Sequence, residues 1–517
     1  MQDEPHHAHR YDSKVAEWAV LIGSMAGVLM QALDTTIANV ALPYMEGGLA
    51  ASRDQVTWVL TSYIIAAAIM TAPVGWLAAR FGKKNFLITS IAGFTVASML
   101  CGAAQNLEQM VLFRLIQGCF GAALGPLSQA VMLDMYPAHK RGNVMAIWGM
   151  GVMLGPILGP TLGGFLTDAY NWRWIFYINV PFGVAAVMLL LTFFKDTHKD
   201  QTLKFDWFGF GALSVGLAAL QLMLDRGQTK GWFDSSEIVI ECGIAVVGVY
   251  LFLVHMATGK KPFIPLGIFK DRNFVGGLVL MFVMGLVLLA SSALLSPYLQ
   301  TLSGRTVTQT GLLMVPRGFG TMAAMLFAGR LTMKMDPRVL MTIGAGLLCW
   351  SMWEMMYWTP DVSVWTLSWV SFIQGLGMGL LFVPMNLVAF ATLPSHFRAD
   401  GAALTNLTRN IGSAIGVSLT TTILASSVQT IHSHLTAYAS TFNRALGVNA
   451  PSMLMNPQIP FGLSGLNGLI EYRAQVQAYA NDFLFMFITS LPVFAVIWLM
   501  KRPNFAPGTA PEIEVME

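Results

Sequence analysis

Residues 18–42 read WAVLIGSMAGVLMQALDTTIANVAL, and this stretch decides what kind of protein the chain forms. A run of about 20 predominantly apolar residues is long enough to cross the hydrocarbon core of a bilayer as a helix. The stretch holds one charged residue, Asp34, inside its second half. An ionisable group at membrane depth is costly and usually functional. The stretch therefore predicts a membrane-spanning helix that carries a candidate functional acid.

The same apolar pattern recurs along the whole chain. Hydrophobic residues make up 55% of the 517 residues and charged residues 11%, whereas soluble domains are roughly a quarter charged. We expect an all-α polytopic membrane protein with 14 transmembrane helices. The predicted spans are 18–42, 56–78, 86–104, 110–133, 143–166, 174–194, 207–224, 237–256, 274–299, 309–329, 339–358, 364–391, 402–425 and 482–500.

The basic residues predict the orientation. Most of the 30 Lys and Arg residues fall in the tails and in every second gap between spans, the pattern of loops that face the cytoplasm. We therefore expect an inner-membrane protein with two cytoplasmic tails, 1–17 and 501–517. His6, His7 and His9 could bind a metal, but a disordered tail fits their surroundings better, so no metal site is expected.

One gap is much longer than the others. Residues 426–481 form a mainly polar segment that the predicted orientation places outside. Long loops without clear secondary structure are usually either functional or disordered. Docking of a partner protein and the absence of any role both remain open for this loop.

An internal repeat divides the chain. An offset of 257 residues aligns Ile116-Gln117-Gly118 with Ile373-Gln374-Gly375, and Gly155 and Gly159 with Gly412 and Gly416. We expect two six-helix bundles, 18–194 and 274–500, with an inserted helix pair at 207–256. Duplicated bundles of this kind hold a substrate site at their interface and rock around it, so the repeat favours transport.

Three further groups of residues form motifs. The loop after the second span contains Gly75, Arg80, Gly82, Lys83 and Lys84. The fourth span contains Arg114 and Gln117. The fifth span contains Gly151, Gly155, Pro156, Gly159, Pro160, Gly163 and Gly164.

With these motifs the chain resembles the major facilitator superfamily and, within it, the fourteen-span drug/proton antiporters of the EmrB/QacA type. Residues 33–43, LDTTIANVALP, are similar to the first-span signature of that family. The fifth-span motif is similar to the one that distinguishes antiporters from symporters. The resemblance implies proton-driven export of hydrophobic drugs across the inner membrane. In the EmrB branch, which the chain resembles most, it also implies a periplasmic adaptor protein and an outer-membrane channel as partners.

The two buried charges of the first half are the main site candidates. Asp34 suits a proton carrier, because burial raises the proton affinity of a carboxylate. The alternative is a structural acid bonded to Thr35, Thr36 or Asn39. Arg114, with the help of Gln117, would adjust the pKa of Asp34 or relay its proton. The alternative is that Arg114 has a structural role and holds two helices together.

The fifth-span glycines recur at intervals of four, so they share one helix face and allow another helix to approach closely. Their role as a seal against proton leak is implied by the resemblance alone. The basic residues after the second span act either as topology anchors or as a latch between the halves. Ala79 stands where the superfamily motif usually has Asp, and Asp134 could replace that acid.

Substrate-binding residues are harder to select, because lipid-facing and cavity-facing side chains are both apolar. The polar and charged candidates are Gln31, Asn39, Arg317, Glu354, Asn386 and Arg409. Arg317 could attract anionic drugs or pair with Glu354. Arg409 could instead extend its side chain toward the cytoplasmic surface.

The energy source follows from what the sequence lacks. It contains no Walker-type nucleotide loop, so we expect an ion gradient and no cofactor. An isolated carboxylate near an Arg suits protons better than sodium. Three functions remain: a multidrug exporter, an exporter of one endogenous lipid, siderophore or antibiotic, and a receptor or enzyme that has lost transport. No nucleophile–base pair is evident, so we do not expect an enzyme.

Overall fold

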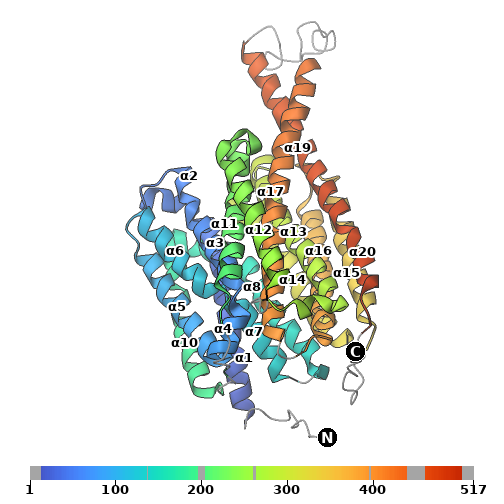
Figure 1. The fold of residues 1–517 in the computed structure, drawn as a ribbon. Coiled ribbons are helices and arrows are strands. Elements are labelled where there is room, and N and C mark those ends of the chain that lie inside the picture. Colours follow the sequence, from blue (N-terminus) through green and yellow to red (C-terminus); the bar gives the residue numbers. More distant parts are fainter. Residues whose placement is uncertain are drawn as a thin grey trace.

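The computed structural model describes residues 13–136, 138–195, 199, 204–259, 264–332, 334–394, 397–438 and 460–502. These residues form a long helical bundle without strands (Figure 1). The helix α1 begins and the helix α20 ends at the same end of the bundle, called here the terminus end. His6, His7 and His9 lie outside the described residues.

Among the described residues, 11 helices are long and apolar enough to cross a membrane, or 12 with one bent pair. The expected spans 143–166 and 339–358 are also helices, but they fall outside this count. The predicted all-α class is confirmed, whereas the number of 14 spans stays a prediction.

The first half comprises α1 (Lys14–Gly48), α2 (Arg53–Val56), α3 (Trp58–Thr71), α4 (Val74–Phe81), α5 (Lys83–Ala103), α6 (Leu107–Gly121), α7 (Leu124–Met135), α8 (Ala138–Ala169), α9 (Trp174–Tyr177) and α10 (Asn179–Phe193). The expected second span is not straight. It bends by 59° between α3 and α4, where Pro73 precedes the second helix. A proline lacks the N–H that would continue the helical hydrogen bonds, so it marks the bend.

The second half comprises α13 (Arg272–Pro297), the π-helical turn η3 (Tyr298–Leu302), α14 (Val307–Leu331), α15 (Pro337–Met355), α16 (Val364–Ala391), α17 (Arg398–Tyr438), α19 (Pro460–Ser490) and α20 (Pro492–Leu499).

The prediction of a loop over 426–481 was wrong in its extent. The helix α17 continues to Tyr438 and α19 begins at Pro460, so the two project together beyond the other helices (Figure 1). The hydrogen bond between His432 Nε2 and Asn467 Oδ1, 2.9 Å long, joins them. A helix outside the bilayer needs no apolar surface toward lipid, so hydropathy did not reveal these turns. We call this feature the α17–α19 hairpin and the end that carries it the hairpin end.

The inserted pair consists of α11 (Trp207–Lys230) and α12 (Ser236–Thr258). The two helices pack against each other at Gly216 and Gly248. The helix α11 also contacts α3 of the first half and α17 of the second, and Trp232 Nε1 donates a 3.0 Å hydrogen bond to Thr422 Oγ1. The pair therefore lies across the seam between the halves.

The halves meet chiefly where α8 packs against α14 and α16. A Cβ atom at Gly142 of α8 would lie 2.9 Å from the carbonyl oxygen of Gly329 of α14, so the two backbones touch. The ring of Trp148 stacks on that of Phe382, with their centroids 5.9 Å apart. Gly142 lies in the first turns of α8 and Gly329 in the last turn of α14, which places this contact toward the terminus end.

Candidate functional site

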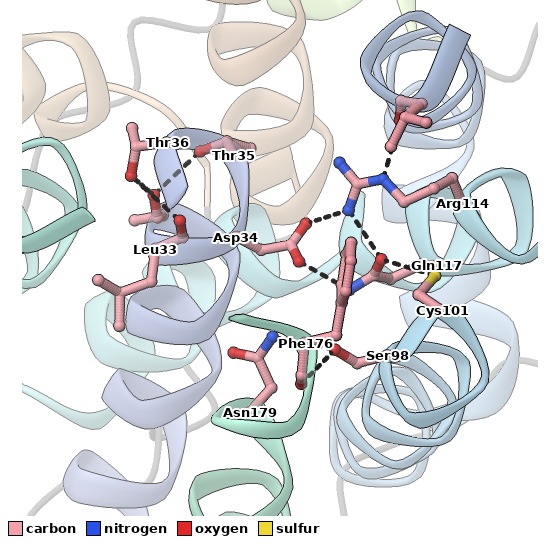
Figure 2. A network of polar contacts seen from close by, with 12 residues as sticks. Leu33, Asp34, Thr35, Thr36, Ser98, Cys101, Arg114, Gln117, Phe176 and Asn179 are labelled. Carbon is pink, nitrogen blue, oxygen red and sulfur yellow. Dashed lines mark hydrogen bonds and ion pairs between the residues drawn. The ribbon is translucent and has the colours of Figure 1, made fainter. Parts of the chain in front are cut away.

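Asp34, Arg114 and Gln117 form one buried network between α1 and α6 (Figure 2). Arg114 Nη1 donates to Asp34 Oδ2 at 2.6 Å, and Gln117 Nε2 donates to Asp34 Oδ1 at 2.9 Å. Arg114 Nη1 also donates to Gln117 Oε1 at 2.8 Å. Both carboxylate oxygens of Asp34 are therefore bonded, one of them to a guanidinium.

This network is closed off from water. Asp34 is 1% exposed and Arg114 is 0% exposed. The guanidinium of Arg114 donates from Nε to the carbonyl oxygen of Val59 at 2.9 Å and lies 4.3 Å from the ring centroid of Tyr63. Hydrogen bonds to its remaining atoms stabilise a buried ion pair, although Arg114 Nη2 has no partner among the described residues. Removal of one member of the pair leaves an uncompensated charge. Protonation of Asp34 would create that situation for Arg114.

The alternative interpretation of Asp34 named three neighbours on its own helix. The hydroxyl of Thr36 donates to the carbonyl oxygens of Ala32 at 3.0 Å and Gly155 at 3.0 Å, rather than to Asp34. The side chain of Asn39 lies outside the described residues. Asp34 is thus held across helices, by α6, more than within α1.

The fifth-span glycines place α8 directly against α1. A Cβ atom at Gly155 would lie 2.3 Å from the carbonyl carbon of Ala32, and one at Gly159 would lie 2.1 Å from Thr36 Oγ1. Gly151 faces Met25 in the same way, whereas Gly164 has open space beside it. Close packing along this face agrees with the glycine spacing. Gly163 lies in the same helix, and the side chains of Pro156 and Pro160 lie outside the described residues.

A cluster of charged residues joins the halves at the terminus end. Asp134, at the end of α7, forms ion pairs with Lys83 of the first half and with Arg398 Nη1 of the second, the latter at 3.1 Å. We call Lys83, Asp134 and Arg398 the latch. Asp134 therefore contacts the basic loop that lacks an acid at position 79, as its place in the sequence suggested.

The other residues of the motif after the second span make separate contacts. Gly75 packs so closely on Asp400 of α17 that a Cβ atom there would overlap its carboxylate. Gly82 has a φ of 84° between α4 and α5, a conformation that favours glycine. Lys84 Nζ donates to the carbonyl oxygen of Leu191 within the first half, and Arg80 is half-buried.

Comparison with known proteins identifies the family of the chain. The sequence profile of the Major Facilitator Superfamily matches residues 24–417. The chain belongs to the major facilitator superfamily. The multidrug export protein EmrB of Escherichia coli strain K12 is 37% identical over 494 residues, which cover 93% of this chain and 94% of that protein. The fatty acid resistance protein FarB of Neisseria gonorrhoeae is 32% identical over 95% of this chain and 97% of its own.

Among solved structures, the proton:xylose symporter XylE superposes with a TM-score of 0.57 at 16% identity, over 92% of this chain and 95% of that chain. At this identity the likeness shows the fold alone. The identity to EmrB confirms the predicted EmrB-type branch of the major facilitator superfamily. The chain is accordingly a multi-pass transport protein of the bacterial inner membrane.

In this superfamily member, amide side chains gather at the seam. Gln129 Nε2 of α7 donates to Asn386 Oδ1 of α16 at 2.8 Å, and both residues are buried. Gln31 of α1 and Asn406 of α17 both face Gly125, as the atoms nearest to a Cβ atom there show. Gln31 and Asn386 were predicted candidates, whereas Gln129 and Asn406 were missed. The repeat contained the signal for Gln129, because the offset of 257 pairs it with Asn386.

The charged candidates of the second half lie apart from the Asp34 network. Arg317 is 7% exposed and donates to Ser292 Oγ at 3.0 Å and to the carbonyl oxygen of Leu288 at 3.2 Å. The suggested ion pair of Arg317 with Glu354 is not formed between these two described residues. Glu354 is half-buried in the last turn of α15, toward the hairpin end.

Arg409 lines a small cavity at the seam. The cavity, of ≈ 20 Å³, has room for about one water molecule. Its other walls are mainly methionines and phenylalanine, from both halves: Met153, Met281, Met284, Leu288, Thr321, Met325, Met378 and Phe382. Methionine is flexible and polarisable, so this wall can adapt to different shapes. Arg409 is thus half-buried and belongs to the residues that line this cavity.

Proposed function

We propose that this protein is a proton-driven antiporter that exports hydrophobic compounds from the cytoplasm across the inner membrane by alternating access. The observation that carries the proposal is the isolated, buried bond between Asp34 and Arg114 on the helix that packs against the fifth-span glycines. The membership in the EmrB-type branch supports the same direction of transport.

In the proposed mechanism, a proton and the Arg114 guanidinium compete for the carboxylate of Asp34. In the conformation described, the Arg114 guanidinium holds the carboxylate. A proton arriving from the periplasm would weaken that bond and leave Arg114 with Val59 and Gln117 as partners. Because α1 contacts α8 along the glycine face, a change at Asp34 is passed directly to the helix that meets α14 across the seam. Binding of a compound at the seam would favour the opposite change and release the proton to the cytoplasm.

The orientation and the partners belong to the same proposal. With both termini in the cytoplasm, the latch and the contact of Gly142 with Gly329 close the seam on the cytoplasmic side. The α17–α19 hairpin then projects into the periplasm. Its position supports a periplasmic adaptor protein and an outer-membrane channel as partners.

Proton movement in everted membrane vesicles tests the proposal. Addition of a transported compound should dissipate an imposed pH gradient in vesicles with the wild-type protein, but not with Asp34→Asn. A panel of toxic compounds against a sensitised strain should show protection by the wild type alone. Equal protection by Asp34→Asn would show that Asp34 does not couple transport to protons.

A second candidate function, export of one anionic lipid, rests on a specific observation. Arg409 is the one charged residue among the residues that line the cavity, and Arg317 bonds the backbone of Leu288 in the cavity wall. A carboxylate on a hydrophobic chain fits these groups, and one relative is named as a fatty acid resistance protein. The panel should therefore include long-chain fatty acids. Protection against these alone would favour this second function.

A further inference from the structure

A second fully buried carboxyl group lies in the other half of the molecule. Asp482 on α19 is 0% exposed, and neither Oδ1 nor Oδ2 has a hydrogen-bond partner among the residues that the structure describes. By contrast, Asp34 has a partner for each oxygen. An ionised carboxylate that is buried without a partner is strongly disfavoured, and such a group takes up a proton instead. The mechanism described above does not use Asp482.

Aromatic side chains surround this part of α19. Tyr479, one turn before Asp482, packs against Tyr298 with ring centroids 5.3 Å apart, and Phe483 packs against Trp358 at 6.2 Å. The hydroxyl of Tyr298 and Nε1 of Trp358 are buried and also lack hydrogen-bond partners within the described part of the chain. Tyr298 begins the π-helical turn η3, and π turns are frequently found at functional sites. This region therefore holds several buried donors and acceptors without hydrogen-bond partners among the described residues.

A cleft at the hairpin end reaches the same aromatic cluster. It has a volume of ≈ 520 Å³ and is lined by the end of α15, by α17 and by α19. Trp358 belongs both to the cleft wall and to the cluster that contains Phe483 and Tyr298. Val476, Gln477 and Ala480 of α19 line the cleft, while Asp482 faces the protein interior. Trp358 thus borders the outer cleft and packs against Phe483, the residue that follows Asp482 on α19.

No counter-ion holds Asp482 in the part of the chain that the structure describes. The charged side chains on the helices packed against α19 are Arg272 on α13, Arg338 and Glu354 on α15, and Arg398, Asp400, Arg409, His432 and His434 on α17. The helix itself carries Glu471 and Arg473. None of these forms an ion pair or hydrogen bond with Asp482. The titratable side chain that interacts electrostatically with Asp482 is that of Tyr479, one turn earlier on the same helix.

We propose that Asp482 is a second proton-binding site, which holds a proton in this conformation and exchanges it with the outer cleft when Trp358 moves. The proton comes from hydronium in the cleft and leaves a water molecule behind. This role in transport rests on the proton coupling proposed above. It assigns to the second half a proton site of its own, at the opposite end of the bundle from the latch.

Infrared spectroscopy of the purified full-length protein tests the protonation directly. The wild type should show the carbonyl-stretch band of a protonated carboxyl group at neutral pH. The band should disappear in Asp482→Asn and shift in Asp482→Glu. Asp234→Asn, which changes an exposed acid between α11 and α12, is the control and should leave the band unchanged. A wild-type spectrum identical to that of Asp482→Asn would overturn the proposal.

Counting protons in proteoliposomes separates this inference from the proposed function. Asp482→Asn should still transport, with fewer protons moved per substrate and a flatter dependence of the rate on outside pH. If Asp34→Asn abolishes proton movement while Asp482→Asn moves as many protons as the wild type, the proposed function stands and Asp482 has no transport role. If the wild type moves no protons with any compound, both proposals fail, although the infrared band still reports whether Asp482 is protonated.

Discussion

Gln117 and Gln374 occupy equivalent places in the two halves, yet their surroundings differ completely. Both are 0% exposed. Gln117 bonds Asp34 and Arg114, whereas neither amide atom of Gln374 has a partner. An offset of 254, slightly smaller than 257, aligns the first spans of the halves and pairs Asp34 with Leu288. The offset of 257 pairs Arg114 with Ser371. The second half thus has the glutamine without the charged residues that it bonds in the first half.

The packing of the two halves, in contrast, is alike. A Cβ atom at Gly159 would lie 2.1 Å from Thr36 Oγ1, and one at the equivalent Gly416 would lie 2.5 Å from the carbonyl oxygen of Leu286. Each half thus presses a glycine face against its first helix. The two halves thus share their helix packing, while the buried Asp34–Arg114 ion pair has no counterpart at the equivalent positions Leu288 and Ser371 of the second half.

The largest expected effect concerns the acid itself. Asp34→Asn should reduce drug-driven proton movement to the level of vesicles without the protein, because an amide cannot bind and release the proton. Leu288→Asn, the same amide at the equivalent position, should retain proton movement. The pH signal of everted vesicles measures both. Loss of coupling in both variants would contradict a special role of the first half.

Removal of Arg114 tests whether the pair is a clamp or a coupling device. Arg114→Ala should lower the free energy of unfolding by about 3–5 kcal/mol, because Asp34 is left as an unpaired buried charge. Asp34→Leu combined with Arg114→Met should restore the melting temperature in detergent, yet not restore proton coupling. Recovery of coupling in the double variant would leave the pair only a structural role. Ser371→Ala is the control in the second half.

The glycine face should tolerate no side chain. Gly159→Val should destabilise the protein by about 1–3 kcal/mol or more, because its side chain overlaps Thr36, and efflux should fall with it. Gly164→Val, in the same helix but beside open space, should keep the wild-type melting temperature and efflux. Normal coupled efflux with Gly159→Val would exclude the seal.

The two glutamines should respond in opposite directions. Gln374→Met should raise the melting temperature, since an unsatisfied buried amide costs about 1–3 kcal/mol that an apolar side chain of similar shape avoids. Gln117→Met should lower it, because Asp34 and Arg114 each lose a hydrogen bond. Thermal unfolding in detergent compares the pair. A decrease for both variants would mean that Gln374 is bonded in solution.

The smallest effect is expected at the latch. Asp134→Asn removes both ion pairs, and partly exposed pairs are worth about 0–1 kcal/mol each. The population with an open terminus end should therefore rise by about 5-fold per kcal/mol lost. Distances between spin labels at Lys140→Cys and Arg330→Cys, which are both exposed, would report it. Lys84→Ala, whose bond to Leu191 stays within the first half, should change nothing. Unchanged distances in Asp134→Asn would show that the latch does not hold the seam.

Most of the fold was predictable because lipid imposes a simple rule. Buried backbone must be hydrogen-bonded within its own segment, so apolar runs of sufficient length become helices. The rule does not apply to segments that lie outside the lipid. The hairpin turns of α17 and α19 are polar helices, which hydropathy cannot distinguish from loops. The bend at Pro73 was overlooked because the apolar pattern continues across it.

The charged residues of the site were predictable because charged residues are rare within apolar spans. Asp34 and Arg114 stand out in apolar spans, so their pairing could be anticipated, whereas the carbonyl of Val59 and the ring of Tyr63 come from packing that no pattern shows. Asp482 was missed for a related reason. Hydropathy began the last span at this very residue, so a fully buried acid was taken for the edge of a helix.

The hydrogen bond between Gln129 and Asn386 carries a trace of how such a molecule arises. The two residues are 257 positions apart, the offset of the repeat, so they lie on the local two-fold axis that relates the halves. Before duplication, a residue on that axis would have met its own copy in a symmetric dimer. Acids or bases would repel their copies there, but an amide both donates and accepts and is complementary to itself. The contact between Gln129 and Asn386 thus joins equivalent positions of the two halves through side chains that are complementary to each other.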